Sequence, residues 1–292
     1  MNTTKQKANR LGIFFLKPLL RLFYVVPMNV LYLFSPLLQT ILTSITNYRK
    51  DVIYQNLKNS LVDEEDTTIH KIRSDNYQHL SEIILENLKV FSGGSFRSSL
   101  SFDIANPEIL NSLFEEKKDV ILMTGHLGNW ELGFSHASEF FKHDVYGVYK
   151  EQSNEEFDKY LYKLRTQRGL TLITEKQFVR SILSEKEVPR IFVLIPDQSP
   201  KTNKSIAFFT FLNQRTAFST SLEKIAVRFD LPVVFADIVK LKRGKYQAKL
   251  MWLYTGKGDH PKITSQYARH LERNILSDPS IWLWSHRRWK HS

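Results

Sequence analysis

From about residue 119 to the C-terminus, short apolar runs alternate with segments whose apolar residues recur at helical spacing. The apolar runs predict strands at 120–124, 145–149, 170–173, 191–195, 232–238 and 246–253. The amphipathic segments predict helices at 131–141, 154–168, 175–183, 219–228 and 263–276. Alternating strands and helices are typical of an α/β domain with a mostly parallel central sheet flanked by helices.

The region before this alternation is predicted to be helical. Residues 49–61 carry apolar side chains at helical spacing, and 66–73 and 80–90 continue the pattern. Residues 92–95 predict a loop. Because no repeat, low-complexity segment or linker interrupts the chain, we expect residues 49–292 to form one domain.

The N-terminal segment, residues 1–48, has a different character. No charged residue occurs from 22 to 48, and about twenty apolar residues suffice to span a bilayer. Pro27 and Pro36 interrupt the run, however, and basic residues flank it on both sides, so no orientation is favoured. We expect membrane attachment, either as a broken helix or hairpin in one leaflet or as a single span. The alternative is a pair of buried core helices in a soluble domain.

Composition narrows the classes of partner. The chain has no cysteine, which excludes disulfides and thiolate metal sites and fits a cytoplasm-facing location. Its formal net charge of +11 favours anionic partners such as an anionic membrane, phosphorylated lipids or an acidic carrier protein. No nucleic-acid-binding signature is present, so nucleic acid is the least favoured of these partners.

The segment Asp-Val-Ile-Leu-Met-Thr-Gly-His-Leu-Gly-Asn-Trp-Glu, residues 119–131, is the most informative. It begins as a strand, breaks at Gly125, and places His126 and Glu131 on either side of a tight corner. A histidine that a carboxylate orients at the carboxyl end of a strand is suited to general-base activation of a hydroxyl. We therefore expect His126 on the turn and Glu131 on the next helix, with Asn129 as the helix cap. The alternative is an ordinary strand-to-helix turn with a structural histidine.

Other charged residues follow further predicted strands. Lys150 ends the second strand and precedes a helix that reaches Arg165 and Arg168. Because the carboxyl ends of parallel strands meet at one edge of the sheet, Lys150 is expected in the same crevice as His126. Surface positions on a solvated helix are the alternative for these cations.

Two polar residues, Asp197 and Gln198, follow the strand predicted at 191–195. A carboxylate and an amide at a strand end can orient an acceptor headgroup or support a basic ligand. Asp197 is equally suited to cap a turn.

The C-terminal segment, residues 278–290, concentrates tryptophans and cations, among them Arg287 and Arg288. Trp and Arg together suit a membrane interface or a phosphorylated headgroup. They equally suit a tail that docks on the core through cation–π contacts.

Together these segments resemble the lipid A late acyltransferases, a family of the lysophospholipid acyltransferase superfamily, over roughly residues 49–290. The resemblance rests on the His-x4-Glu motif, on Asp197-Gln198, on the aromatic segment 208–220 and on the C-terminal segment. The chain departs from the family at Lys150, where the family has arginine. Lysine keeps the positive charge but loses the bidentate geometry of arginine. It also departs at 213–216, where the family has Gly and Pro in the turn.

The resemblance implies a glycerol-phosphate-acyltransferase-like domain that follows an apolar membrane segment. It implies that backbone amides at the helix start near Ser219 hold an anion or oxyanion. The phenylalanines before Ser219 either line an acyl-chain channel or belong to the core. The expected substrate-binding residues are Asn129, Lys150, Arg168, Asp197, Gln198, Ser219, Arg287 and Arg288.

The implied reaction is O-acylation of a lipid at the cytoplasmic face of the inner membrane. His126 would deprotonate a lipid hydroxyl as it attacks an acyl thioester, and Glu131 would hold the imidazole tautomer. The donor is acyl carrier protein, or else acyl-CoA, and the default acceptor is a lipid A precursor. Neither Gly-x-Ser-x-Gly nor cysteine is present, which favours direct transfer over an acyl-enzyme. No metal or other cofactor is expected, since His-Glu-x-x-His is missing and one His-x4-Glu pair offers too few ligands.

Three alternatives to this function stay open. One is a thioesterase or hydrolase that uses the same base with water as acceptor. Another is an acyltransferase for a different lysolipid or an aminolipid. The last is a non-catalytic, membrane-bound lipid-binding protein on the same fold.

Overall fold

The computed structural model describes residues 18, 20–93, 99–151, 154–200, 205–258 and 262–290. Its centre is a seven-stranded sheet in the order β1-β9-β8-β2-β5-β3-β4, and β6 and β7 form a separate hairpin. The strands are β1 (Ser101–Ile104), β2 (Val120–Met123), β3 (Asp144–Tyr149), β4 (Thr171–Thr174), β5 (Arg190–Leu194), β6 (Ile206–Phe211), β7 (Gln214–Ser219), β8 (Val233–Lys242) and β9 (Lys245–Tyr254).

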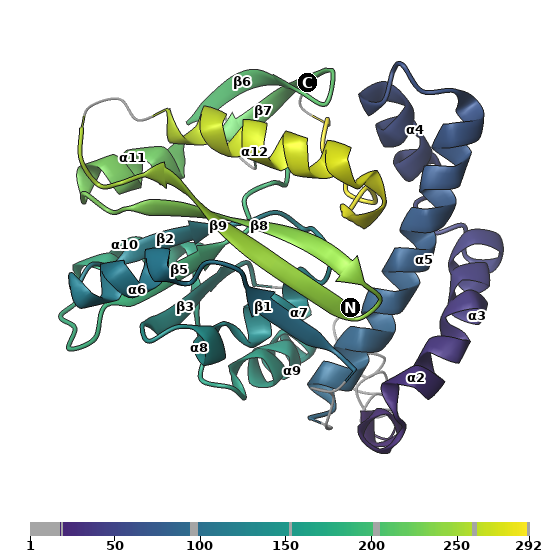
Figure 1. Cartoon of the computed structure of the whole chain (residues 1–292), viewed down its shortest axis with the longest axis horizontal. Coiled ribbons are helices and arrows are strands. Elements are labelled where there is room, and N and C mark those ends of the chain that lie inside the picture. Colours follow the sequence, from purple (N-terminus) through teal and green to yellow (C-terminus); the bar gives the residue numbers. More distant parts are fainter. Residues whose placement is uncertain are drawn as a thin grey trace, which may run out of the picture.

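The helices surround this sheet (Figure 1). The α-helices are α2 (Met28–Leu31), α3 (Ser35–Thr40), α4 (Lys50–Ser60), α5 (Asp66–Phe91), α6 (Glu108–Glu115), α7 (Trp130–Ser135), α8 (Ala137–Phe140), α9 (Glu155–Thr166), α10 (Glu175–Leu183), α11 (Ser221–Arg228) and α12 (Ile263–Ser277). Shorter helical turns are η1 (Tyr32–Phe34), η2 (Ile41–Ile45) and η3 (Pro279–Ile281). In the view of Figure 1, α12 lies above the sheet and α8 and α9 lie below it.

The predicted α/β class with a mostly parallel sheet is confirmed. Within the seven-stranded sheet, β8 and β9 pair antiparallel and the other neighbours pair parallel. Every residue of β2 and β5 is buried, as expected for apolar strands in the middle of a parallel sheet. The carboxyl ends of β2, β5 and β3 therefore share one edge of the sheet.

Three elements were not predicted from the sequence. They are β1, α6 and the β6–β7 hairpin, whose turn residues Leu212 and Asn213 both have positive φ, at 51° and 60°. Positive φ at both turn residues is the geometry of a tight hairpin turn, and Gly usually supplies it. Because neither turn residue is a glycine, the sequence does not indicate a hairpin here. It predicts only a turn before a helix.

Helix α5 supports the right-hand side of the molecule in Figure 1, and the N-terminal helical segment lies along it. A buried lysine fixes the start of that segment. Lys89 is 2% exposed, and its ammonium donates to the backbone carbonyls of Phe23, Tyr24 and Val26 at 2.8–2.9 Å. These carbonyls lie at the end of a helical turn, where acceptors lack helical partners. Residues 1–17 and 19 of the predicted segment and 94–95 of the predicted loop lie outside the described residues.

The apolar part of the N-terminal segment is mostly exposed. The helix Met28–Ile45 has a mean hydropathy of 1.3, and 17% of it is buried, so length and composition make it a candidate membrane span. It is interrupted by the 3-10 turn η1 and the π-helical turn η2. A pair of buried core helices does not fit this exposure. Large apolar side chains on the exposed surface are Leu22, Tyr24, Val25, Val30, Leu33, Phe34, Leu37 and Ile45.

At the end of the sheet opposite to the carboxyl ends of β2, β5 and β3, a buried ion pair joins the starts of β2 and β5. Asp119 accepts hydrogen bonds from the Arg190 guanidinium at 2.9 and 3.2 Å and from its backbone N–H at 2.7 Å. Both side chains are nearly inaccessible, at 6% and 3% exposure. The pair therefore links the starts of the two central strands, and Lys186, whose side chain is 32% exposed, also contacts Asp119 at 2.5 Å.

We expect Asp119→Ala to lower the free energy of unfolding by about 3–5 kcal/mol, because it leaves a buried guanidinium without its carboxylate. Urea denaturation measures this loss. The control is Glu115→Ala, which removes an exposed ion pair with Lys142 and should cost about 1 kcal/mol or less. Equal losses in the two variants would contradict this role of Asp119.

Candidate active site

The site forms where β2 and β5 end side by side. Met123 and Leu194 are aligned as the last residues of the two strands, and His126 and Asp197 each follow after a short turn. The imidazole Nδ1 of His126 lies 2.5 Å from Oδ1 of Asp197. The backbone N–H of His126 donates to Oδ2 of the same carboxylate at 2.9 Å. The fold therefore pairs His126 with the neighbouring strand end.

The Asp197 carboxylate is buried and has a full set of donors. Its side chain is 3% exposed, and the indole N–H of Trp282 also donates to Oδ2, at 2.9 Å. Burial alone would raise the pKa of Asp197, but the charge of His126 and these hydrogen bonds outweigh it and lower the pKa. Asp197 is therefore an anion at neutral pH.

This carboxylate determines the tautomer of His126. An anionic Asp197 accepts a hydrogen bond from Nδ1–H, so that the unprotonated nitrogen of the neutral ring is Nε2. The amide Nε2 of Gln198 lies 3.4 Å from this Nε2, at the exposed side of the ring. Trp130 packs edge-on against the imidazole, with ring centroids 5.1 Å apart. Asp197 thus orients the histidine through Nδ1, and the Gln198 amide donates a long hydrogen bond to Nε2.

The expected pair of His126 with Glu131 does not form. Glu131 lies on α7, and its carboxylate forms a bidentate ion pair with Arg165 of α9, at 2.7 and 2.8 Å. Both side chains are largely buried, at 9% and 20% exposure. The start of α7 directs Glu131 towards α9, and Asp197 occupies the position next to the imidazole. Asp197 thus has the orienting position that the sequence suggested for Glu131.

Asn129 caps α7, as the sequence predicts. Its Oδ1 accepts the backbone N–H of Leu132 at 2.9 Å, and its Nδ2 donates to Glu86 at 2.8 Å. The side chain is fully buried. The structure therefore gives Asn129 a structural role in place of the substrate contact expected for it.

The C-terminal segment completes the turn that carries His126. The backbone N–H of Leu283 donates to His126 O at 3.1 Å, and that of Gly128 donates to Ile281 O at 3.0 Å. Trp282 reaches Asp197 from this segment. This contact is not predicted from the sequence, because Trp282 and Asp197 are 85 residues apart.

The tryptophans of this segment belong to the core. Trp282 and Trp284 are 3% and 0% exposed, which rules out the membrane-interface interpretation for these two side chains. Arg288 stacks on Phe218 with its guanidinium carbon 4.4 Å from the ring centroid, as expected for a docked tail.

Arg288 is buried, at 2% exposure, and donates to the backbone carbonyl of Ala217 at 2.8 Å. Burial lowers its pKa to about 10. The expected substrate contact through Arg288 is therefore not available in this structure. Its neighbour Arg287 is exposed.

Three other residues predicted for the site, Lys150, Arg168 and Ser219, lie at or just after the ends of separate elements. Lys150 is exposed at the end of β3, the strand next to β5, and so lies at the predicted edge. Arg168 forms an ion pair with Glu139 of α8 at 2.8 Å. Ser219 accepts the backbone N–H of Ser221 at 3.3 Å at the start of α11, and no described hydrogen bond joins it to His126.

The aromatic segment before Ser219 contributes to the core. Phe211 and Phe218 are buried and pack edge-on against one another, with ring centroids 5.3 Å apart. Phe211 also contacts Trp282 at 6.1 Å between centroids. For these two residues the core interpretation is confirmed.

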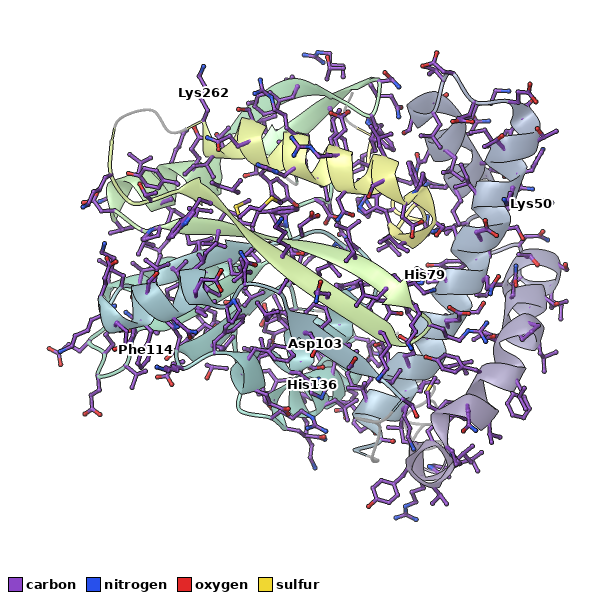
Figure 2. The ribbon with its side chains drawn as sticks, in the orientation of Figure 1. Lys50, His79, Asp103, Phe114, His136 and Lys262 are labelled. Carbon is purple, nitrogen blue, oxygen red and sulfur yellow. The ribbon has the colours of Figure 1, made fainter. Side chains whose placement is uncertain are left out.

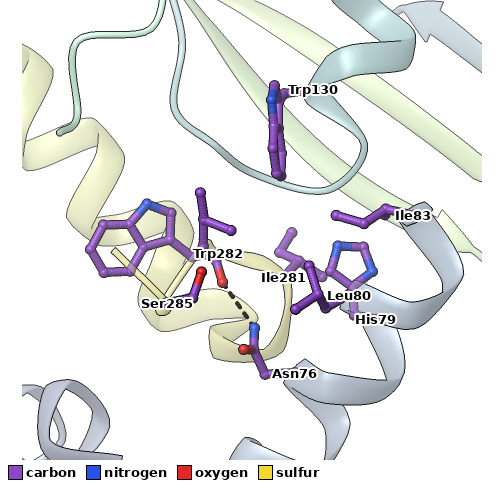
Figure 3. A pocket seen from close by; sticks show the side chains of 9 residues that line it. Asn76, His79, Leu80, Ile83, Trp130, Ile281, Trp282 and Ser285 are labelled. Atoms are coloured by element: carbon purple, nitrogen blue, oxygen red, sulfur yellow. Dashed lines mark hydrogen bonds between the residues drawn. The ribbon is translucent and has the colours of Figure 1, made fainter. Parts of the chain in front are cut away.

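A small cavity lies beside Trp130, between α5 and the C-terminal segment (Figure 3). Its volume is about 10 Å³, which leaves room for about one water molecule. An acyl chain therefore does not fit there in this conformation. Within the described residues, no three histidine or acidic side chains converge as metal ligands would. The lining residues are Asn76, His79, Leu80, Ile83, Trp130, Ile281, Trp282, Leu283 and Ser285.

The family model described as bacterial lipid A biosynthesis acyltransferase matches residues 2–291. The chain belongs to this family. No curated protein sequence matches the chain. Membership means that the protein is an acyltransferase that transfers an acyl group to a lipid acceptor.

In this acyltransferase we expect Asp197→Asn to disturb the tautomer of His126, because an amide can donate to Nδ1 as well as accept from it. The 15N chemical shifts of the imidazole nitrogens, assigned by comparison with His126→Ala, measure the change. Wild type should show a protonated Nδ1 and an unprotonated Nε2 in the neutral ring. A wild-type ring with the proton on Nε2 would contradict this geometry.

Proposed function

We propose that the protein is a membrane-associated O-acyltransferase in which His126 is the general base and Asp197 orients it. The observation that supports this most directly is the short contact between His126 Nδ1 and Asp197, which leaves Nε2 on the exposed side. A base needs this combination of a fixed tautomer and an accessible nitrogen.

In the proposed reaction, Nε2 takes the proton of a lipid hydroxyl as its oxygen attacks the thioester carbonyl. A C–O bond forms and the carbonyl becomes a tetrahedral oxyanion. The C–S bond then breaks, and the leaving thiolate takes the proton from Nε2. Asp197 stabilises the imidazolium between these steps, and general-base help of this kind is worth about 10²–10⁴ in rate.

Glu131 has a different role in this proposal. Its bidentate pair with Arg165 holds a guanidinium at the start of α7, a turn away from the imidazole. The Glu131 carboxylate faces Arg165 of α9, and no described hydrogen bond joins it to His126. We therefore propose that Glu131 positions Arg165 and does not determine the tautomer of His126.

For the substrates, we propose an acyl carrier protein as donor and a lipid A precursor as acceptor. The net charge of +11 supports the donor, because it attracts an acidic carrier protein. Membership of the lipid A family supports the acceptor. Lys150, Gln198 and Arg287 are the exposed polar residues that we propose for contact with these substrates.

We also propose that the N-terminal segment binds the cytoplasmic side of the inner membrane within one leaflet. The helix Met28–Ile45 is apolar, largely exposed and broken by η1 and η2. It packs along α5, and its large apolar side chains are exposed, which suits a surface inserted into lipid. Its 18 residues would extend about 27 Å, slightly less than the hydrocarbon thickness of about 30 Å.

The acyl-transfer proposal is tested with an acyl-carrier-protein thioester and a lipid A precursor, with the products measured by mass spectrometry. We expect one added acyl chain with wild type and a rate about 10²–10⁴ lower with His126→Ala, because the base is lost. The control is His70→Ala, an exposed histidine on α5 outside the site, with an unchanged rate. Full activity in His126→Ala would overturn the base, and release of free fatty acid alone would indicate a hydrolase.

The membrane proposal is tested by flotation with vesicles that contain anionic lipid. Leu33 and Leu37 are 76% and 59% exposed. We expect Leu33→Glu/Leu37→Glu to weaken binding about 100-fold or more, since each buried leucine contributes about 1.5–3 kcal/mol. Val62→Glu/Leu183→Glu, at sites 58% and 67% exposed outside the segment, is the matched control. Equal binding of the two double variants would contradict attachment through this surface.

A further inference from the structure

Helix α5 presents one row of buried polar side chains to the rest of the molecule. The residues are three or four positions apart and so share a face of the helix. Their partners lie in the N-terminal segment, in the turn after His126, in the β8–β9 hairpin and in the C-terminal segment. Figure 2 shows one of them, His79, which lies between α5 and the β8–β9 hairpin. The row consists of Asn76, His79, Glu82, Glu86 and Lys89.

Glu86 is the member of this row that joins the most distant elements. It is fully buried, and its Oε1 accepts the hydroxyl of Tyr32 at 2.7 Å. Its Oε2 accepts the Asn129 amide at 2.8 Å and the hydroxyl of Tyr246 at 2.9 Å. One carboxylate therefore connects the N-terminal segment, the turn after His126 and strand β9 of the sheet.

The bond to Asn129 stabilises the turn from His126 to Glu131, the catalytic turn. Because Glu86 accepts from Nδ2, the amide of Asn129 is held with Oδ1 towards the backbone N–H of Leu132. This cap fixes the first turn of α7. The same turn carries Trp130, which packs on the imidazole, and Glu131, which holds Arg165. Loss of Glu86 would leave a buried amide without its acceptor at the start of α7.

The bond to Tyr32 acts on the N-terminal segment. The Tyr32 hydroxyl lies against the β8–β9 turn so closely that a Cβ at Gly244 would come within 2.6 Å of it. The Arg243 guanidinium covers the Tyr32 ring, 5.1 Å from its centroid. Tyr32 can therefore reach Glu86 only when the segment is docked along α5.

We propose that Glu86 is a positioning residue that makes the order of the catalytic turn depend on docking of the N-terminal segment. When Tyr32 is in place, Glu86 is fixed, Asn129 is oriented and the turn from His126 to Glu131 is held. Displacement of the segment removes one of the three donors to Glu86 and loosens this turn. The effect on activity rests on the proposed function, but the ordering of the turn does not.

The experiment is hydrogen–deuterium exchange of the full-length protein in detergent, followed by mass spectrometry of peptides that cover residues 126–135. We expect Glu86→Gln to increase exchange there about tenfold, because an amide offers only one acceptor oxygen to three donors. Tyr32→Phe should increase exchange in the same peptides by a smaller factor. This conservative variant decides the outcome if Glu86→Gln does not fold.

Two matched variants control for general loosening. Glu223→Gln alters a half-buried carboxylate on α11 that accepts the backbone N–H of Thr264 at 2.8 Å, and no described hydrogen bond joins it to α5 or to the catalytic turn. Tyr254→Phe removes a hydroxyl at the end of β9 that bonds to Gly258 O, 3.4 Å away and outside both the N-terminal segment and the catalytic turn. Neither should change exchange in the catalytic turn.

Unchanged exchange in Glu86→Gln and Tyr32→Phe would overturn the proposal, and so would equal increases in all four variants. A kinetic measurement separates it from the proposed function. Glu86→Gln should lower kcat with KM nearly unchanged, because the base is displaced while substrate contacts remain. If wild type transfers no acyl group but the exchange pattern is as expected, the proposed function fails and the positioning role of Glu86 stands.

Discussion

The contact between His126 and Asp197 depends on the parallel alignment of β2 and β5, and the rest of the site is arranged around it. Two oxygens of one buried carboxylate bind the imidazole, the backbone N–H of His126 and the indole of Trp282. A buried anion is stable only with donors of this kind. The C-terminal segment therefore has to dock on the turn after β2 before the carboxylate is satisfied. Docking of this segment is therefore needed both to complete the fold and to satisfy the carboxylate that orients His126.

The second constraint is that the turn after His126 is held from α5 and α9. Asn129 bonds to Glu86, and Glu131 bonds to Arg165, so neither side chain reaches the imidazole. Asn129 thus positions the backbone at the start of α7, and Glu131 positions a neighbouring cation. In the proposed mechanism His126 is the reacting group, and the hydroxyl and the thioester approach from the Nε2 side of the ring.

The sequence predicted the parts of this structure that depend on local patterns. Apolar runs placed β2 and β5, the helix Glu175–Leu183 has the predicted bounds, and Asn129 caps α7 as its residue type suggests. The sequence did not predict which carboxylate orients His126. Glu131 is five residues away and Asp197 is 71, and only the pairing of two strands brings the second one close. Spacing along a chain carries no information on such a contact.

The central claim is that Asp197 acts through His126 and Glu131 does not, and a double-mutant cycle on the rate of acyl transfer tests it most directly. Residues that act as one unit show strongly non-additive losses. If Asp197 acts through His126, Asp197→Asn should cause a large loss in wild type and almost none in His126→Ala, whereas Glu131→Gln should cause the same loss in both backgrounds. A Glu131→Gln effect that disappears in His126→Ala, with an Asp197→Asn effect that persists there, would contradict this role of Asp197.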